Sequence, residues 1–518
     1  MLELLALTLP ALPALAALGI ALVWLLGLSA PERTVRRLAL LGLGGAALGL
    51  AWVGYARWAG DLRGLVHAGT WLTLGDLRVD LAVRLDTLGL TLAGLAVGSC
   101  LVVARFGTHY MHREVGFIRF FGLICLFCSA MLLLFLSANM VGAFAGWELA
   151  GLCSALLIGY AWDRPTAIAH ARYAYAVNRA GDAAFLLGIG LCWGWTDGVG
   201  WAIDTDALSP GRALALALCF AFAAAVKSAQ VPFSGWIFRA MEGPTPTSAL
   251  FYGTLLVSAG PYLLLRLAPL LQLTPVASSL IFTQGLMTAL LGSLAARVMP
   301  DTKSALITAA VGSLGLVMAL AGLGFQTAAL IFLVAHAATR GAQLLTAPSV
   351  LVLHAGAQPA ESATWLRRHP GLWLVAFRRL WLEELLTRAL AQPLRRLGAS
   401  LDAFDRAIVD RATGSPVPSA RTATTLARWE ESHGEGHEDA PSDVGRGRGL
   451  MGRTAQVTAS ALAQFEERLV LEAIGHGLPE YSGRLAGLFG RVEAVFASPW
   501  FVFVVAGLSL LQLLSEGG

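Results

Sequence analysis

The chain is organised as a series of long, uninterrupted apolar runs separated by short polar stretches. A helix of about 20 apolar residues spans the ~30 Å hydrocarbon core of a bilayer. The runs lack the strict alternation that marks the strands of outer-membrane barrels. The pattern predicts an all-α, polytopic helical membrane protein with about 12 transmembrane helices, some of them broken. The expected spans lie at roughly 3–28, 39–58, 87–104, 117–136, 139–160, 170–195, 211–229, 246–268, 276–297, 303–322, 326–352 and 497–514.

One polar stretch predicts strands instead of helices. Residues 70–84 alternate apolar and polar side chains on both sides of Gly75 and Asp76. Alternation with a period of two is typical of strands, and Gly and Asp favour a tight turn. We expect a β-hairpin that caps the helices between the second and third spans.

The pattern changes after residue 355. Up to residue 411, Arg and Glu interleave with Leu and Trp, as in an amphipathic helix that lies along the interface or on neighbouring helices. The next stretch is rich in Gly, Ser, Pro, Glu and His, which is typical of a flexible linker. We predict a transmembrane domain of about 11 helices followed by a C-terminal amphipathic arm, with boundaries at 1–355, 356–411 (lateral segment), 412–452 (linker), 453–495 (second amphipathic segment) and 496–518 (final transmembrane helix).

Loop charges predict the orientation of these spans, because Lys and Arg collect in short cytoplasmic loops. Three loops are basic and should be cytoplasmic. Their basic residues are Arg33, Arg36 and Arg37, then Arg105, Arg113 and Arg119, then Arg297 and Lys303. The intervening loops are acidic, through Asp61, Asp76, Asp80, Asp86, Asp197, Asp204 and Asp206. Both ends of the chain would then lie outside the cytoplasm.

Composition excludes several classes of function. Of the 518 residues, 56% are hydrophobic and only 14% are charged, so lipid is the expected surrounding and a soluble fold is excluded. The net charge of +4 is small, and nothing supports nucleic-acid binding. The first apolar run has no basic segment before it and no cleavage site, so we expect a retained helix and not a signal peptide.

Metal and cofactor sites have little support in the sequence. The six cysteines fall within or beside apolar runs, where they are expected to pack as small apolar side chains. Cys125 and Cys128 have the spacing of a zinc pair but lack a second pair of ligands. His433 and His437 lie in the acidic linker, where solvated side chains are expected. No signature of quinone binding is present, and we expect no cofactor and no metal in this chain.

Two ionisable side chains lie inside apolar runs long enough to span a bilayer. Glu148 lies within residues 132–159, and Lys227 follows the run 213–226. Burying a charge in hydrocarbon costs several kcal/mol, so such residues usually line an ion or proton path. The sequence therefore suggests a protein that moves charge, in which a change at Glu148 alters the protonation of Lys227.

Arg179 and Asp182 lie in the span that follows Glu148. They are three residues apart and so share a helix face. Two interpretations are open: a local structural ion pair, or a pair that tunes Glu148.

Prolines predict where helices break. Pro232 follows Lys227 by five residues, and it removes a backbone donor and crowds the preceding turn. A lysine beside such a break can exchange protons with trapped water, although it could instead extend to the interface. Pro244 and Pro246 are further predicted breaks.

Further candidates lie later in the chain. Lys303 begins the tenth span, while His336 and Arg340 are four residues apart on one face of the eleventh. A relay along this face and a satisfied structural histidine are both open interpretations.

Together these segments resemble the antiporter-like subunit family shared by respiratory complex I, Mrp-type cation antiporters, membrane hydrogenases and DabA/DabB inorganic-carbon systems. The resemblance covers about residues 1–355 and implies a multi-pass protein of a bacterial inner membrane. It also implies that Glu148 and Lys227 are the paired charges of a proton half-channel, with Lys303 as a central relay. The motifs that resemble the family are 146–154, 178–182, 227–236, 241–250 and 301–303.

The departures from the complex I L-type pattern suggest a branch of that family. Tyr252 stands where L-type subunits have a histidine, and Arg340 stands where they have a lysine. The segment after 356 lacks the second broken helix with its lysine, so the usual second half-channel is incomplete. An independent complex I pump subunit is therefore not the first expectation.

Residues 241–253 and 340–349 are most similar to DabB-type subunits. This implies a cation-conducting subunit that energises CO2/bicarbonate uptake by a DabA-like cytoplasmic zinc protein, with the zinc in that partner and no catalytic chemistry in this chain. The alternatives are a proton-translocating subunit of complex I, a hydrogenase or an Mrp-like antiporter, whose partners would be other membrane subunits, or a structural subunit that only clamps neighbours. The coupling ion, proton or Na+, stays open.

Overall fold

The computed structural model describes residues 2–26, 31–75, 77–347 and 368–378, with short pieces at 388–389, 392–393, 396–401 and 403–404. The chain divides into two compact units, and nearly all of the described residues lie in the first, which includes residues 32–383. The predicted linker, the second amphipathic segment and the final span at 497–514 lie outside the described residues. The helices and strands named below belong to the first unit, except for the last residues of α2.

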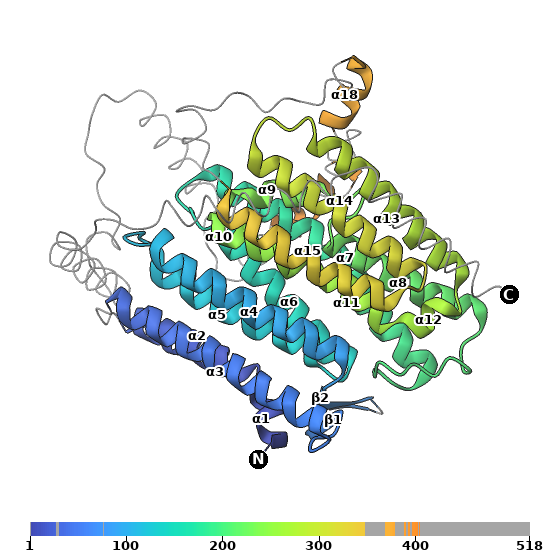
Figure 1. Cartoon of the computed structure of the whole chain (residues 1–518). Coiled ribbons are helices and arrows are strands. Elements are labelled where there is room, and N and C mark those ends of the chain that lie inside the picture. Colours follow the sequence, from blue (N-terminus) through green and yellow to red (C-terminus); the bar gives the residue numbers. More distant parts are fainter. Residues whose placement is uncertain are drawn as a thin grey trace, which may run out of the picture. The chain divides into compact units, whose positions relative to one another are not determined.

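The first half of the chain forms long helices and one hairpin (Figure 1). Their bounds are α1 Leu2–Thr8, α2 Ala11–Leu25, α3 Glu32–Ala59, β1 Leu65–Leu74, β2 Leu77–Arg84, α4 Thr87–Tyr110, α5 Phe117–Leu136, α6 Met140–Ile158, α7 Pro165–Thr196 and α8 Pro210–Lys227.

The second half begins with short helical pieces and then returns to long helices. These are α9 Gly235–Arg239, the 3₁₀ turn η1 Ala240–Glu242, α10 Thr245–Ser248, the π-helix η2 Ala249–Thr254, the 3₁₀ turn η3 Leu256–Ser258, α11 Ala259–Arg266, α12 Ala268–Gln272, α13 Pro275–Ala296, α14 Thr302–Gly322, α15 Gln326–Thr346 and α18 Pro370–Phe377.

Nine helical segments of the described chain are long and apolar enough to cross a membrane, and α1 with α2, bent by 49°, would make a tenth. The predicted all-α, multi-pass fold is confirmed. Helix α7, the sixth expected span, is not among the nine, although its 32 residues reach about 48 Å. It packs against both α6 and α8, so these two helices can contact its polar side chains.

Several spans begin at a side chain that caps the helix. Asp86 accepts a hydrogen bond from the Gly89 amide (2.8 Å), and Asn139 accepts one from the Gly142 amide (2.8 Å). Asp301 caps α14 through the Ser304 amide (2.9 Å). Each cap satisfies one of the amides that a helix leaves without a partner in its first turn. These caps set where the apolar runs become helical.

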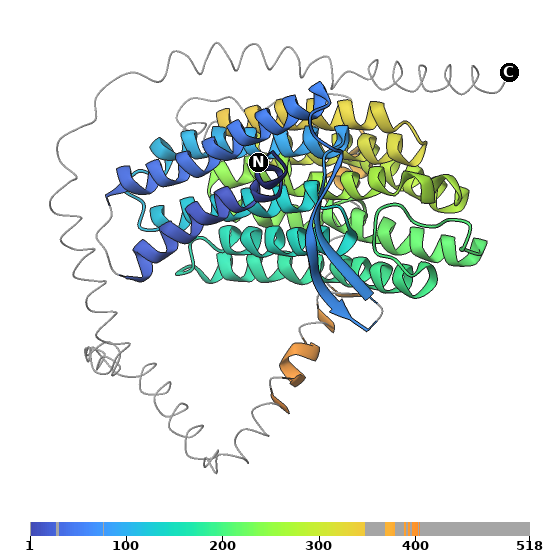
Figure 2. The same ribbon diagram turned by 90° about the horizontal axis from the view of Figure 1, so that it is seen from below.

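The predicted hairpin is present, and its first strand begins five residues earlier than expected. Leu74 pairs with Leu77 across the turn, and Gly75 has a φ of +58°, a left-handed conformation that glycine adopts without strain. Figure 2 shows the two strands lying crosswise to the long helices. The Asn139 side chain donates to the Asp80 carbonyl (2.7 Å), which fastens the hairpin to the start of α6.

Contacts between loops show which loops lie together at each end of the bundle. At one end, the Glu32 carboxylate contacts His112 Nδ1 (2.7 Å) and the Tyr110 hydroxyl donates to Thr245 (3.2 Å), so the starts of α3 and α10 lie beside the end of α4. At the other end, the Trp201 indole donates to the Ser137 carbonyl (2.9 Å) beside the hairpin. Basic loops gather at the first end and acidic loops at the second, as the loop charges predict. Which end faces the cytoplasm stays a prediction.

Helices α13 and α14 pack at backbone distance. A β-carbon added to Gly292 would lie 2.6 Å from the Gly312 nitrogen, which is closer than such atoms approach. Small residues allow this contact, because association of helices in lipid depends on close van der Waals packing. The pair α13 and α14 therefore forms a rigid wall beside α8 and α11.

Candidate functional site

Four charged side chains from three helices meet inside the bundle. The Arg179 guanidinium on α7 donates a hydrogen bond to Glu148 of α6, and its other terminal nitrogen lies 2.7 Å from Asp182 Oδ2. Asp182 Oδ1 lies 3.9 Å from the Nζ of Lys227, the last residue of α8. The structure thus places four of the predicted path residues in one series of alternating charges, called here the charge network.

Burial increases along the charge network. The side chains of Glu148 and Arg179 are 28% and 29% exposed, whereas those of Asp182 and Lys227 are 4% and 1% exposed. An isolated buried charge is costly, so a buried ammonium needs counter-charges and hydrogen bonds. With both carboxylates and both cations ionised, the network is neutral. Lys227 lies among protein atoms and does not extend to an interface.

Trp147 supports the buried half of the network. Its indole nitrogen donates to Asp182 Oδ1 (2.5 Å), its carbonyl accepts from Lys227 Nζ (3.3 Å), and its ring lies 4.8 Å from that ammonium. A cation over an indole face is attracted by the negative potential of the ring. Trp147 therefore positions both members of the inner pair.

Gly151 leaves room for the cations. A β-carbon at this position would lie 3.2 Å from Lys227 Nζ and 3.4 Å from Arg179 Nη2. The sequence analysis did not single out Trp147 or Gly151 as site residues. Their positions relative to Glu148 could have indicated them. Trp147 is the residue before Glu148, and Gly151 lies three residues after it and so on the same helix face.

The break after α8 holds Lys227 in place. Helix α8 ends at Lys227, and Pro232 lies in the short segment before α9. The Val231 amide donates to Thr288 Oγ1 (3.0 Å), and the Gln284 side chain donates to the Val231 carbonyl (2.8 Å). The backbone amide and carbonyl of Val231 thus both find partners on α13, as non-helical backbone at membrane depth requires.

A second irregular segment brings Lys303 close to Tyr252. Pro244 caps α10 and Pro246 is its second residue, and the span from Thr245 to Arg266 contains α, π and 3₁₀ turns. Lys303 Nζ donates to the Met241 carbonyl (3.4 Å), and the Tyr252 hydroxyl donates to the adjacent Ala240 carbonyl (3.1 Å). Two consecutive carbonyls of η1 therefore receive a lysine of α14 and a tyrosine of η2.

His336 and Arg340 lie on a different group of helices. His336 Nδ1 is 2.8 Å from the Ser313 hydroxyl, its Nε2 is buried without a hydrogen-bond partner, and Arg340 donates to Gln343 Oε1 (2.9 Å). Their helix, α15, packs on α14 and η2, whereas the charge network lies on α6, α7 and α8. The structure thus places these two predicted residues apart from the network.

One charged pair lies at the acidic end of the bundle. The Arg266 guanidinium donates to the Asp86 carboxylate and also to the Tyr262 hydroxyl (3.2 Å). Burial raises the pKa of Asp86, but the hydrogen bond and the charge of Arg266 outweigh burial, so the pKa lies below its ordinary value. This pair fastens the start of α4 to the end of α11.

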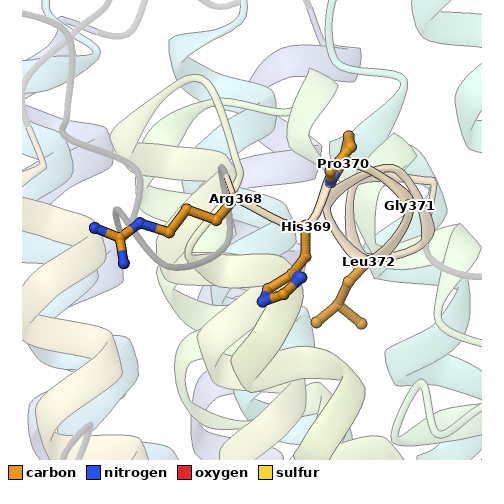
Figure 3. A pocket seen from close by; sticks show the side chains of 5 residues that line it. All are labelled: Arg368, His369, Pro370, Gly371 and Leu372. Atoms are coloured by element: carbon orange, nitrogen blue, oxygen red, sulfur yellow. The ribbon is translucent and has the colours of Figure 1, made fainter.

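The pocket found in the described part of the chain lies away from the charge network. Within the described residues, no group of three or more His, Cys, Asp or Glu side chains could hold a metal ion. A shallow pocket lies at the start of α18, where His369 and Leu372 point to the same side and Arg368 points away (Figure 3). Its lining contains no residue of the network. The pocket residues are Arg368, His369, Pro370, Gly371 and Leu372.

Two family models match this chain. The model described as NADH-ubiquinone oxidoreductase (complex I), chain 5 N-terminus, matches residues 71–121. The model described as NADH:quinone oxidoreductase/Mrp antiporter, transmembrane, matches residues 137–376, which contain the whole charge network. These two regions belong to the complex I/Mrp antiporter family.

Curated relatives of the complex I/Mrp antiporter family match over about half of this chain. The chain is 36% identical over 275 residues to NADH-quinone oxidoreductase subunit L of Mycobacterium tuberculosis, covering 52% of this chain and 43% of that one. It is 34% identical over 291 residues to NAD(P)H-quinone oxidoreductase subunit 5, organellar chromatophore 1, of Paulinella chromatophora, covering 54% and 44%. The matched region thus spans less than half the length of these relatives.

Solved structures share the fold. A chain of the Mrp complex from Dietzia sp. DQ12-45-1b superposes with a TM-score of 0.58 at 24% identity, covering 98% of this chain and 63% of that one. A chain of the membrane-bound sulfane sulfur reductase, an archaeal respiratory membrane complex, gives a TM-score of 0.60 at 15% identity, covering 97% of both chains. The predicted multi-pass helical membrane fold is therefore confirmed, and the match to the complex I/Mrp antiporter family holds for residues 71–121 and 137–376. The finer resemblance to DabB-type subunits stays a prediction.

Proposed function

We propose that this chain is an ion-conducting membrane subunit that moves protons through the charge network. The observation that supports this proposal is the series of alternating charges that ends at Lys227, a 1%-exposed ammonium beside a broken helix. Charged groups at such depth are expensive, and they are retained where charge has to move.

The chemistry of the four side chains assigns their roles. A guanidinium stays protonated in proteins, so Arg179 is a fixed positive charge between two carboxylates. Glu148, Asp182 and Lys227 can gain or lose protons. Loss of a proton from Lys227 would leave the network with one excess negative charge, which favours a proton on Glu148 or Asp182. The protonation of the two ends is thereby coupled.

Glu148 is the group that would exchange protons with the surroundings. Its side chain is 28% exposed, and its Oε1, which is itself buried, has no hydrogen-bond partner in the described structure and could therefore take up a proton. Lys227 is the inner end, and Lys303, His336 and Arg340 would continue the path on α14 and α15. This continuation rests on the resemblance to the family, because these three residues lie outside the charge network.

We further propose that the proton movement energises CO2/bicarbonate uptake by a DabA-like cytoplasmic zinc protein. The support is the similarity of residues 241–253 and 340–349 to DabB-type subunits and the missing second broken helix. The relatives named above are subunits of oxidoreductases and of an Mrp complex, so other complex I, hydrogenase or Mrp membrane subunits are the alternative partners. In either case the zinc or redox chemistry would belong to a partner.

Proton flux in proteoliposomes tests the first proposal. The purified full chain, with any protein that copurifies, is reconstituted, and decay of an imposed pH gradient is followed with a trapped dye. We expect flux from the wild type and background leak from Lys227→Ala. Arg212→Ala is the matched control, because Arg212 is an exposed cation in the first turn of the same helix. Wild-type flux from Lys227→Ala, with normal assembly, would overturn the proposal.

Copurification and growth test the finer proposal. A large soluble zinc protein that copurifies alone would support the DabA-like partner, whereas a set of redox subunits would overturn it. Lys227→Ala should abolish support of bicarbonate-dependent growth without loss of assembly. Retention of growth after neutralising both Glu148 and Lys227 would favour a purely structural subunit.

A further inference from the structure

A second cluster of charges lies at the basic end of the bundle, outside the charge network. Glu242, the last residue of η1, lies 3.0 Å from an Arg164 guanidinium nitrogen and 3.7 Å from His170 Nδ1. Arg164 is the residue before α7, and His170 lies in the second turn of that helix. The Glu242 side chain is 19% exposed, while its partners are 55% and 37% exposed. The Glu242 carboxylate is thus partly exposed at the basic end of the bundle.

The backbone carbonyls next to Glu242 bind side chains from inside the bundle. The preceding carbonyl, that of Met241, accepts from Lys303 Nζ, and the carbonyl before it accepts from Tyr252. Within the described residues, the carboxylates whose charges act on Lys303 are those of Asp301 and Glu242. Lys303 is therefore a half-buried ammonium with one carboxylate at its own helix start and a second on the neighbouring segment.

The segment around Glu242 is held in place from several sides. A β-carbon at Gly243 would lie 2.8 Å from the Leu157 carbonyl at the end of α6, so this glycine allows the segment to lie directly on α6. The Thr247 hydroxyl donates to the Pro244 carbonyl (2.7 Å), which fixes the turn into α10. The charged groups that face this segment are Arg164 and His170 by α7 and Asp301 and Lys303 by α14. Arg239, at the end of α9, lies over the Tyr173 ring of α7.

We propose that Glu242 is the proton-exchange group between Lys303 and water at the basic end of the bundle. The inference rests on the proposed function, because it extends the same path beyond Lys303. Neither the family match nor the charge network assigns a role to this carboxylate. Its position, one residue from the carbonyl that binds Lys303 and partly open to water, fits a group that passes protons in and out.

The step is a single proton transfer. An N–H bond of the Lys303 ammonium breaks, the proton passes through water between the two side chains, and an O–H bond forms on the Glu242 carboxylate, which leaves a neutral amine and a neutral acid. The acid then releases its proton to water, and the restored carboxylate pairs again with Arg164 and His170. One proton moves per cycle, and the reverse sequence loads Lys303.

Proteoliposome flux with three variants of the full chain tests the proposal. Glu242→Gln keeps the size and the hydrogen-bonding oxygen but cannot exchange a proton, so we expect flux to fall about 100-fold, the usual scale for losing a proton-transfer group. Glu242→Asp should restore a large part of the flux. Arg164→Gln breaks the ion pair but keeps the carboxylate, so flux should stay near that of the wild type.

Glu32→Gln is the matched control, because Glu32 pairs with His112 at the same end of the bundle and has no contact with the Lys303 segment among those described. Equal loss in Glu242→Gln and Arg164→Gln, with no rescue by aspartate, would show a structural clamp and overturn the proposal. Wild-type flux in Glu242→Gln together with background leak in Lys227→Ala would overturn it while the proposed function stands. A wild-type chain without flux overturns both.

Discussion

The contact between Asp182 and Lys227 allows a quantitative test of the charge network. We replace Asp182 with Asn, which keeps the oxygen that accepts from Trp147 and removes only the charge. At 3.9 Å and an effective dielectric constant of about 20, the attraction between the two charges is about 4 kcal/mol. Both side chains are almost completely buried, so solvent weakens this value little. Arg179, which also contacts Asp182, reduces the part that belongs to Lys227 alone.

We expect a double-mutant cycle of Asp182→Asn and Lys227→Met to show a coupling free energy of about 2–4 kcal/mol. Asp182→Asn alone leaves a buried ammonium without its nearest counter-charge and should destabilise by about 3 kcal/mol or more. The double variant should be more stable than Asp182→Asn, because the uncompensated charge is gone. The free energy of unfolding is measured by reversible SDS titration in mixed micelles.

Arg212→Ala provides the control cycle, because Arg212 lies 15 residues before Lys227, about 22 Å along α8. Asp182→Asn and Arg212→Ala should be additive within about 0.5 kcal/mol. If the Asp182 and Lys227 variants are equally additive, the two charges do not stabilise one another and the network assigned to the site is wrong.

Three further predictions concern other positions. Gly151→Val would press a side chain against the ammonium of α8, since even a β-carbon lies 3.2 Å from it, so we expect proton flux in proteoliposomes to fall about tenfold while detergent-purified protein stays monodisperse. Asp86→Asn keeps the helix cap but loses the ion pair with Arg266. Because the folded pKa of Asp86 is lowered, that stability of about 1 kcal/mol is present above the ordinary value of 3.8 and is lost as the pH falls through the folded pKa, so unfolding temperatures of variant and wild type should differ at pH 6 and approach one another only below pH 3.8. Gly292→Leu should abolish the yield of folded protein, because a β-carbon there meets backbone of α14 at 2.6 Å, whereas Gly190→Leu, with open space around it, should express like the wild type.

The membrane spans could be predicted because their formation depends on composition over about 20 residues and hardly on any single contact. The hairpin could be placed by its turn, while the start of β1 was missed because residues 65–69 do not alternate. The span at 246–268 was expected as one helix after a proline break, yet it contains α, π and 3₁₀ turns. The hydrogen bonds that replace the regular helical ones depend on neighbouring helices such as α13 and α15. A single sequence does not show which helices will be neighbours.

The residues of the candidate site also fall into those that the sequence could predict and those that required the structure. Glu148 and Lys227 could be found from the sequence, because an ionisable side chain in an apolar span costs free energy whatever its neighbours are. The pairing of Arg179 with Asp182 follows from their spacing. The contact between Arg179 and Glu148 required the packing of α6 against α7. Glu242 was missed for that reason too: it lies near a loop end, where a carboxylate is common, and its partner Arg164 is distant in sequence.

The support of Val231 by α13 has a mechanical consequence. Thr288 and Gln284, one turn apart on α13, bind the backbone amide and the backbone carbonyl of Val231 in the segment that follows Lys227. The far end of α13 packs, through Leu294 and Val298, against Trp373 and Ala376 of α18, in the segment that leaves the bundle. A single helix, α13, therefore connects α18 to the backbone beside the buried lysine, so a change in the position of α18 would act on that backbone through α13.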